Sequence, residues 1–253
     1  KINFMKYPHP KNHDQHFIFK DEYFENVFKN EEKYKVLVYS ENFDGWNDDL
    51  TDIKDLKISR NHPIDVASIE MCMYLLENYI NEKNKVILEI GCLNGDLTKK
   101  IIENKDYKYI GSDAQQNNII KLASKFKNIP FVIFDITQNP FKSNICNILI
   151  MLNILEHIKD DDKALKEAYR LLDNNGTLII EVPAGKFLYD NYDKKLLHFR
   201  RYNLKEITEK LSRNGFKIEK KTHIGFFIFP LFVIMKLINR IFKNKDIVVK
   251  QTK

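Results

Sequence analysis

The segment from Val86 to Thr98 constrains the fold more than any other part of the chain. Residues 86–90 form an apolar run that contains Glu89, and the turn that follows contains Gly91 and Gly95. The residues after this turn have the apolar spacing of a helix. In such a unit the free amides of the helix start can meet a ligand at the carboxyl end of the strand, and glycine lets the backbone approach it closely.

Strand-like and helix-like segments alternate beyond this unit. We expect strands at residues 86–90, 107–112, 131–134, 148–152 and 177–182, and helices at residues 96–103, 116–126 and 161–172. A helix at 204–212, a strand at 216–220 and a closing edge strand at 247–249 complete the pattern. It predicts an α/β fold with a doubly wound, mostly parallel seven-stranded sheet and helices on both faces.

The first 60 residues alternate polar and aromatic side chains without a sustained period, apart from a candidate strand at residues 34–39. We expect an irregular N-terminal cap over residues 1–60 and a Rossmann-like domain over residues 61–253. The latter opens with a helix at residues 64–80 behind Pro63. It includes a long loop at residues 183–203 and an apolar segment at residues 224–242.

Composition narrows the function classes. The 253 residues are 43% hydrophobic, enough for a sizeable core, and the net charge of +6 is spread along the chain. We therefore expect no nucleic-acid partner. The three cysteines are far apart, so neither a disulfide framework nor a zinc site is predicted, and no signal-peptide pattern precedes the fold. A reducing, cytoplasmic location is the expectation.

Two acidic residues stand at the ends of the next two candidate strands. Asp113 lies 22 positions after Gly91, and Asp135 lies 22 positions after Asp113. In a doubly wound sheet these positions meet in one crevice. A carboxylate after the second strand can accept hydrogen bonds from both hydroxyls of a ribose, and one after the third can accept from an adenine amine. The alternative is that both only cap the turns that follow them.

These motifs resemble those of the class I S-adenosylmethionine-dependent methyltransferases over roughly residues 80–218. Further matching pieces are residues 153–158 after the fourth strand and residues 171–183 through the fifth. The resemblance implies that Glu89, Gly91 and Gly95 hold the amino-acid part of S-adenosyl-L-methionine, that Asp113 holds the ribose and that Asp135 holds the adenine. The product would be S-adenosyl-L-homocysteine. The other cofactor-binding residues expected are Cys92, Ala114, Ile136 and Leu152. Leu93 and Asn147 depart from the family pattern, which often has a glycine and an acid there.

The loop at residues 183–203 is the expected acceptor side. Its Asp, His and Arg-Arg-Tyr resemble a bacterial subgroup of the family that acts on surface glycans or small metabolites. Methyl transfer is an in-line displacement, so the protein supplies alignment and, for a hydroxyl acceptor, a base. We predict His198 and His157 as base candidates, and O-methylation over N-methylation. Acceptor-binding candidates are Asp193, Arg200, Arg201 and Tyr202. The alternative is that Asp193, His198, Arg200 and Tyr202 clamp the loop to the core.

Three further expectations complete the prediction. Some relatives hold a divalent ion with a Glu-x-x-Glu-His sequence, but Asn153 replaces the first carboxylate here, so no metal is expected. The apolar segment at residues 224–242 is interpreted as core or a dimer face, with peripheral membrane contact as the alternative. Two other functions stay open, a non-catalytic S-adenosylmethionine-binding protein and an NAD-dependent oxidoreductase. The latter lacks the G-x-G-x-x-G spacing.

Overall fold

The computed structural model describes residues 6–9, 12–18, 36–38, 63–80, 85–104, 107–127, 129–139, 141, 143–225 and 233–234. Side chains are described from residue 63 onward, with that of residue 116 excepted. The chain divides into two compact units, Lys1–Glu219 and Lys220–Lys253. The first unit contains the sheet and all the candidate site residues. The predicted boundary near residue 60 falls outside the described residues and stays a prediction.

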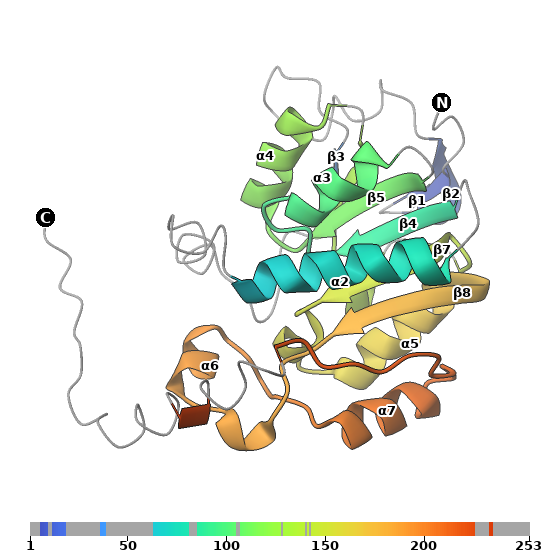
Figure 1. The fold of residues 1–253 in the computed structure, drawn as a ribbon. Helices are drawn as coiled ribbons and strands as arrows, with labels where there is room; N and C mark the ends of the chain where they lie inside the picture. The colour runs from blue at the N-terminus through green and yellow to red at the C-terminus, as the bar shows by residue number, and fades with distance from the viewer. Residues whose placement is uncertain are drawn as a thin grey trace, which may run out of the picture. The chain divides into compact units, whose positions relative to one another are not determined.

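A six-stranded parallel sheet forms the centre of the first unit (Figure 1). Its order is β3-β6-β5-β4-β7-β8. Five of these strands lie between residues 85 and 181, and β3 comes from the N-terminal region. The strands are β3 (Val36–Val38), β4 (Lys85–Ile90), β5 (Tyr107–Asp113), β6 (Phe131–Ile133), β7 (Cys146–Leu152) and β8 (Leu172–Glu181).

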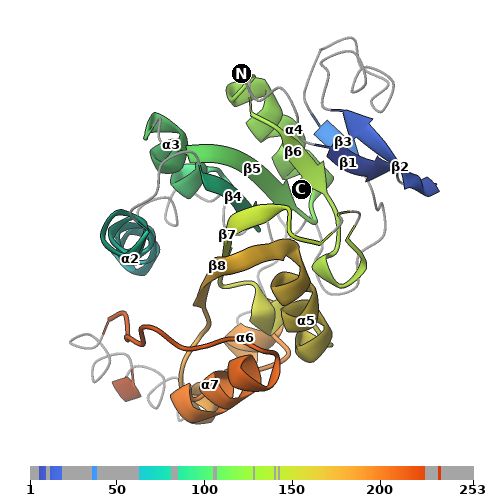
Figure 2. The ribbon, with the colours of Figure 1, turned by 90° about the vertical axis from the view of Figure 1, so that its right-hand side faces the viewer.

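Helices cover both faces of the sheet and bury two apolar cores. On one face, α2 (Pro63–Tyr79), α3 (Asp96–Glu103) and α4 (Gln116–Lys125) pack on side chains such as Ile87 and Ile150. On the other, α5 (Asp161–Leu171) and α7 (Leu204–Arg213) pack on Leu88 and Leu149. Figure 2 shows α2 and α5 on opposite sides of the sheet. Because successive side chains of a strand point to opposite faces, continuous apolar runs supply both cores.

The predicted α/β class and parallel sheet are confirmed, but the predicted number of seven strands is not. The described residues give six strands. The prediction of a strand at residues 216–220 is wrong. The side chains of Phe216 and Ile218 pack on the core under α5 and α7, but the backbone of this segment forms no ladder with a described strand of the sheet. The predicted edge strand at residues 247–249 lies outside the described residues.

The N-terminal region is more regular than predicted. Strands β1 (Lys6–His9) and β2 (Asn12–Ile18) form an antiparallel pair. The candidate strand at residues 34–39 appears as β3, which pairs in parallel with β6. Most of the apolar segment at residues 224–242 lies outside the described residues, so its expected burial or membrane contact stays untested. Among the described residues, no helix combines the length and apolar character that crossing a bilayer requires.

Candidate active site

The carboxyl ends of four strands meet beside β4, where the strand order reverses. The chain runs outward from β4 through β5 to β6, then returns to β7 on the other side of β4. In register, Ile90 pairs with both Ser112 of β5 and Met151 of β7. Open parallel sheets bind ligands at such a reversal, outside the carboxyl ends of the strands. The sequence-predicted cofactor residues all follow or end these four strands.

The turn after β4 needs its two glycines. Gly91 has φ +79°, and a Cβ there would lie 2.0 Å from Cδ1 of Ile154. Gly95 has φ +77°, and a Cβ there would lie 2.5 Å from the Leu122 side chain. The amides of Gly91 and Cys92 both donate to the Ser112 carbonyl oxygen, at 2.7 and 3.0 Å. The turn is therefore tied to the end of β5 and packed against the segment that follows β7.

Leu93 occupies this turn in a conformation that usually belongs to glycine. Its φ is +42°, a left-handed conformation that costs an ordinary residue roughly 1–2 kcal/mol. The amide of Leu93 donates to Oδ2 of Asp113 at 3.0 Å, and this charge-assisted bond helps to hold the conformation. Leu93 therefore keeps the backbone conformation of the turn, although many family members have glycine at this position. The strain lies at the predicted cofactor site, as backbone strain often does at functional sites.

The two acids after β5 and β6 both bind backbone amides. Asp113 is buried and accepts from the amides of Leu93 and of Gln115, the latter at 2.9 Å. Asp135 accepts from the amide of Thr137 at 2.7 Å and so caps the 3-10 turn η2 (Ile136–Gln138). A carboxylate can accept about four hydrogen bonds, so these bonds do not preclude binding of a ribose or an adenine. Their predicted cofactor roles are not tested by the geometry.

The side chain of Glu89 is buried in the core beneath the glycine turn. Its carboxylate is buried and accepts hydrogen bonds from Tyr109 and, at 3.2 Å, from Thr98. The hydroxyls of Thr98 and Tyr109 lie 2.8 Å apart. Burial raises the pKa of Glu89 to about 7, against the effect of these two hydrogen bonds and with a contribution from the charge of Asp113. Sequence reasoning missed both hydroxyl partners: Thr98 ends the segment 86–98 but its side chain was given no role, and Tyr109 stands in no motif.

The acceptor loop is built around the carboxylate of Asp193. This residue is fully buried in the short helix α6 (Asn191–Lys195), and its Oδ2 accepts from the Asp190 amide at 3.0 Å in a capping box. Its Oδ1 accepts from Nε of Arg201 at 2.7 Å and lies 3.1 Å from Nδ1 of His198. Burial raises the pKa of Asp193, but the bonds from His198 and Arg201 outweigh it and hold the pKa below its ordinary value. The carboxylate is therefore ionised.

A second carboxylate, Asp161, binds the other polar residues of the loop. The Tyr202 hydroxyl donates to it at 2.8 Å, and Arg200 and Lys210 make ion pairs with it at 2.8 and 2.7 Å. Arg200 also donates to the carbonyl oxygen of Lys159 at 2.7 Å. Burial opposes these bonds, which nevertheless lower the pKa of Asp161. The predicted acceptor-binding residues thus all bind other residues of the protein, as a clamp would, and their role toward an acceptor stays a prediction.

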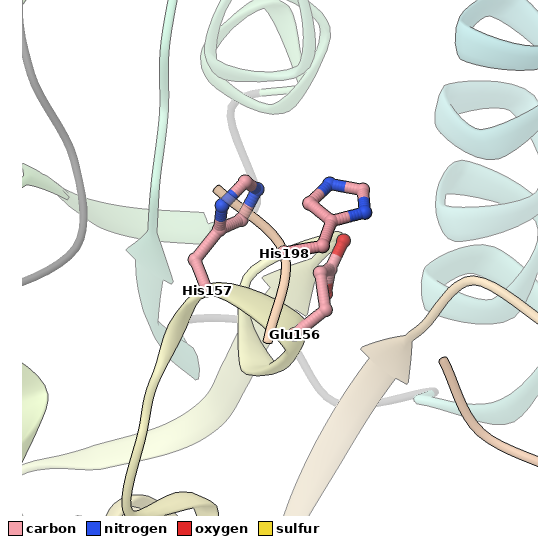
Figure 3. Close-up of side chains that lie close together, drawn as sticks. All are labelled: Glu156, His157 and His198. Carbon is pink, nitrogen blue, oxygen red and sulfur yellow. The ribbon is translucent and has the colours of Figure 1, made fainter. Parts of the chain in front are cut away.

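The base candidates His157 and His198 lie together, with Glu156 beside them (Figure 3). Glu156 and His157 belong to the 3-10 turn η3 (Leu155–His157) directly after β7, and His198 comes from the acceptor loop. The two rings meet edge to face, with centroids 4.6 Å apart. The Phe199 amide donates to the Glu156 carbonyl oxygen at 2.8 Å, which fixes the loop beside η3. Sequence reasoning did not select Glu156, although its neighbour His157 was selected.

Asn153 does not take part in this cluster. With φ +53°, it turns its side chain away and donates to Oε1 of Glu181 at 3.1 Å. Ser68 of α2 donates to the same oxygen at 2.8 Å. Burial raises the pKa of Glu181, against these two hydrogen bonds. Asn147, the other departure from the family pattern, accepts from the Val86 amide at 2.9 Å and so helps to hold the start of β4.

The comparisons with known proteins agree with this geometry. Residues 88–180 match the methyltransferase domain family. Over these residues the chain has a methyltransferase domain of the class I S-adenosylmethionine-dependent type. It is therefore an enzyme, and S-adenosyl-L-methionine is its cofactor. The matched residues contain the glycine turn, both strand-end acids and η3, the elements that form the reversal point of the sheet.

Two sequence relatives and one solved structure illustrate the similarity. An uncharacterised protein of Methanocaldococcus jannaschii is 28% identical over 72% of this chain and 83% of its own length. A probable S-adenosylmethionine-dependent methyltransferase of Mycolicibacterium smegmatis is 22% identical over 53% of this chain and 52% of its own length. The phosphoethanolamine N-methyltransferase 2 of Haemonchus contortus shares the fold, with TM-score 0.56 and 17% identity over 77% of this chain and 50% of that one. The methyltransferase thus spans about half the length of the latter two proteins.

Proposed function

We propose that this methyltransferase acts on a hydroxyl of a small polar acceptor, in preference to an amine. The observation that carries the proposal is the cluster of Glu156, His157 and His198 beside the glycine turn. Ile154, two residues before Glu156, packs against Gly91. A hydroxyl needs a base as it attacks the sulfonium methyl group, whereas a neutral amine needs little help. A cluster of a buried imidazole, a partly buried imidazole and a buried carboxylate next to the cofactor turn matches the first requirement.

The hydrogen bond of His198 selects the nitrogen that could act as base. The ionised carboxylate of Asp193 only accepts hydrogen bonds, so the Nδ1 of His198 that it faces carries the proton. Nε2 is then the nitrogen through which the ring could accept a proton. The same carboxylate fixes the orientation of the ring, as a catalytic base requires. Leu197 and Phe199, on either side of His198, are exposed, so an acceptor can approach this part of the loop from solvent.

The acceptor class is the finer part of the proposal. The resemblance of the loop to the bacterial subgroup favours a sugar-bearing or phosphate-bearing metabolite in surface-glycan modification. Both arginines already bind carboxylates of the protein, so an anionic group on the acceptor would have to compete with Asp161 and Asp193. We therefore place the weight of recognition on hydroxyls rather than on phosphate. A cytoplasmic location without a nucleic-acid partner remains part of the same proposal.

Turnover of radiolabelled S-adenosyl-L-methionine tests the proposal. The acceptor panel contains sugars, sugar phosphates, small amines and bulk transfer RNA. With a hydroxyl acceptor, His198→Ala is expected to lower kcat by on the order of 10²–10⁴ while the affinity for S-adenosyl-L-homocysteine changes little. His223→Ala, a change at an exposed histidine far along the chain, is the matched control. A wild-type kcat in His198→Ala would remove this residue from the mechanism.

The non-catalytic alternative gives a different result. A protein that only binds the cofactor would take up S-adenosyl-L-homocysteine in calorimetry and transfer no label to any acceptor of the panel. Labelled transfer RNA as the sole product would overturn the small-acceptor proposal and leave the methyltransferase assignment in place. An amine product formed equally well by His198→Ala would reverse the preference for a hydroxyl.

A further inference from the structure

We infer that Glu156, His157 and His198 form a binding site for one divalent transition-metal ion. Each residue offers one ligand atom, and these atoms lie within 4.8 Å of one another. The inference rests on the proposed function in one respect: an ion bound to Nε2 of His198 would itself activate the acceptor hydroxyl, so this nitrogen acts as a base only in the metal-free enzyme. The three residues come from two segments, η3 and the acceptor loop, which the fold brings together (Figure 3).

The spacing and burial suit a bound ion. Zinc lies about 2.0–2.2 Å from imidazole nitrogens and carboxylate oxygens, so tetrahedral ligand atoms are roughly 3.4 Å apart. Atoms within 4.8 Å reach that spacing by small side-chain rotations. Glu156 is 1% exposed, His157 is 9% exposed and the His198 side chain is 10% exposed. Bulk water therefore competes little for the ligands.

Asp193 supplies what a ligand histidine needs behind it. Metal-binding histidines almost always donate their second ring N–H to a carboxylate or carbonyl, which fixes the ring and raises its basicity. Nδ1 of His198 lies 3.1 Å from Oδ1 of Asp193. Asp193 is itself held by Arg201 at 2.7 Å and by the Asp190 amide at 3.0 Å. Nε2 of His198 is thus left as the ligand atom, on a ring whose position is already set.

The backbone around the cluster is equally fixed. The His198 amide donates to the Asp193 carbonyl oxygen at 2.9 Å, and the Phe199 amide donates to the Glu156 carbonyl oxygen at 2.8 Å. The Tyr189 hydroxyl donates to the His198 carbonyl oxygen at 2.8 Å. Three hydrogen bonds therefore locate His198 relative to both η3 and α6. The approach of the ligand side chains does not depend on side-chain packing alone.

The donor set selects the type of ion. Two imidazoles and one carboxylate are ligands for zinc, cobalt, manganese or ferrous iron, whereas magnesium and calcium prefer oxygen ligands throughout. Three protein ligands leave coordination positions for a water or an acceptor hydroxyl, whose pKa the ion would lower. The set does not include Asn153, which binds Glu181 instead. The expectation of metal independence rested on Asn153, so it does not apply to these ligands.

Metal titration of the full chain tests the inference. Protein stripped with EDTA is titrated with Co²⁺ while visible d–d absorption is recorded, and with Zn²⁺ in a calorimeter. We expect one ion per chain. His157→Gln and Glu156→Gln should each weaken binding by more than about 100-fold, and Asp193→Asn, which alters no ligand, by about 10–100-fold. His223→Ala should bind like the wild type.

The outcomes separate the site from the proposed function. Each variant is first checked for binding of S-adenosyl-L-homocysteine, which shows that it is folded. If another ligand variant does not fold, His198→Gln takes its place. Equal metal binding by the wild type and the ligand variants would overturn the site. A wild type that methylates a hydroxyl but binds neither Co²⁺ nor Zn²⁺ stoichiometrically would also overturn the site and leave the proposed function standing. Stoichiometric binding without turnover on any acceptor would overturn the proposed function alone.

Discussion

Replacing Glu89 with glutamine should remove a pH dependence from the stability of the fold. The carboxyl lies between Thr98 and Tyr109 in the core under α3. Glutamine has nearly the same shape as protonated glutamate and carries no charge. The substitution therefore keeps the packing and abolishes the ionisation, which makes it a clean test of what burial does to this group.

The magnitude follows from the raised pKa. Burial lifts the pKa of Glu89 from its ordinary value of 4.5 to about 7. Below pH 4.5 the group is protonated in both the folded and the unfolded protein, and the folded state keeps its full stability. As the pH rises from about 4.5 to about 7, the unfolded chain loses this proton readily and the folded protein does not, so stability is lost. Each unit of pKa corresponds to 1.36 kcal/mol, and the total loss is about 3 kcal/mol.

Urea unfolding at pH 5 and at pH 8 measures the effect. The free energy of unfolding of the wild type, relative to that of Glu89→Gln, should fall by about 2.5 kcal/mol between pH 5 and pH 8, because part of the total loss has already occurred at pH 5. In thermal melts this corresponds to roughly 5–10 °C for a chain of this size. Glu103→Gln is the matched control, since its side chain is 63% exposed at the end of α3. This variant should follow the wild type at both pH values within ~0.5 kcal/mol.

Parallel pH profiles for the wild type and Glu89→Gln would refute the reasoning. Such a result would mean that the folded protein stabilises the charged carboxylate as well as water does. The two hydroxyl bonds would then outweigh burial, and the group would be an ordinary acid. A profile with the opposite slope, in which the wild type gains stability as the pH rises, would place an unrecognised cation beside Glu89.

Three further predictions concern the cofactor turn and the loop. Asp113→Ala should weaken S-adenosyl-L-homocysteine binding by ~1.5–3 kcal/mol in calorimetry, because charge-assisted bonds are lost, and unchanged affinity would contradict the assignment of its role. Gly91→Ala should lower the free energy of unfolding in urea, because alanine is strained at φ +79° and its Cβ collides with Ile154. Adding Ile154→Ala should remove the part of this loss that comes from the collision and leave the ~1–2 kcal/mol that comes from backbone strain. Asp193→Ala should cost about 3–5 kcal/mol by leaving Arg201 buried without its carboxylate, and a loss below ~1 kcal/mol would disprove the clamp.

The sequence predicted the parts of the fold that depend on local periodicity. The helix at residues 96–103 was located at the observed bounds, and the five strands between residues 85 and 181 were all expected, because buried strands and amphipathic helices leave clear patterns. The segment at residues 216–220 has the same apolar character, yet Phe216 stacks on Tyr169 and finds no neighbouring strand. Whether an apolar run pairs depends on a neighbour elsewhere in the chain, which periodicity cannot reveal.

The site was predictable only where a strand end determined it. Asp113 ends one strand and Asp135 follows the next, so the parallel sheet alone brings both to the edge of the sheet where Gly91 lies. Tyr109 and Thr98 reach Glu89 from a neighbouring strand and a helix, and no motif indicated this. The approach of His198 to Glu156 depends on a loop whose path is set by Asp193 and by Leu197, which has φ +55°. Contacts made by loops over long sequence separation leave no periodic pattern to read.

The polar side chains of the acceptor loop bind two different carboxylates. This division shows which side chain keeps a polar atom that is not directed at its carboxylate. His198 and Arg201 turn to Asp193, while Arg200 and Tyr202 turn to Asp161. The arginines and the tyrosine meet their carboxylates through their donor groups. His198 alone meets its carboxylate through one of two ring nitrogens and keeps the other directed away from it. The clamp therefore positions His198 without engaging its second ring nitrogen, so the clamp contacts are compatible with the base role that we propose for this residue.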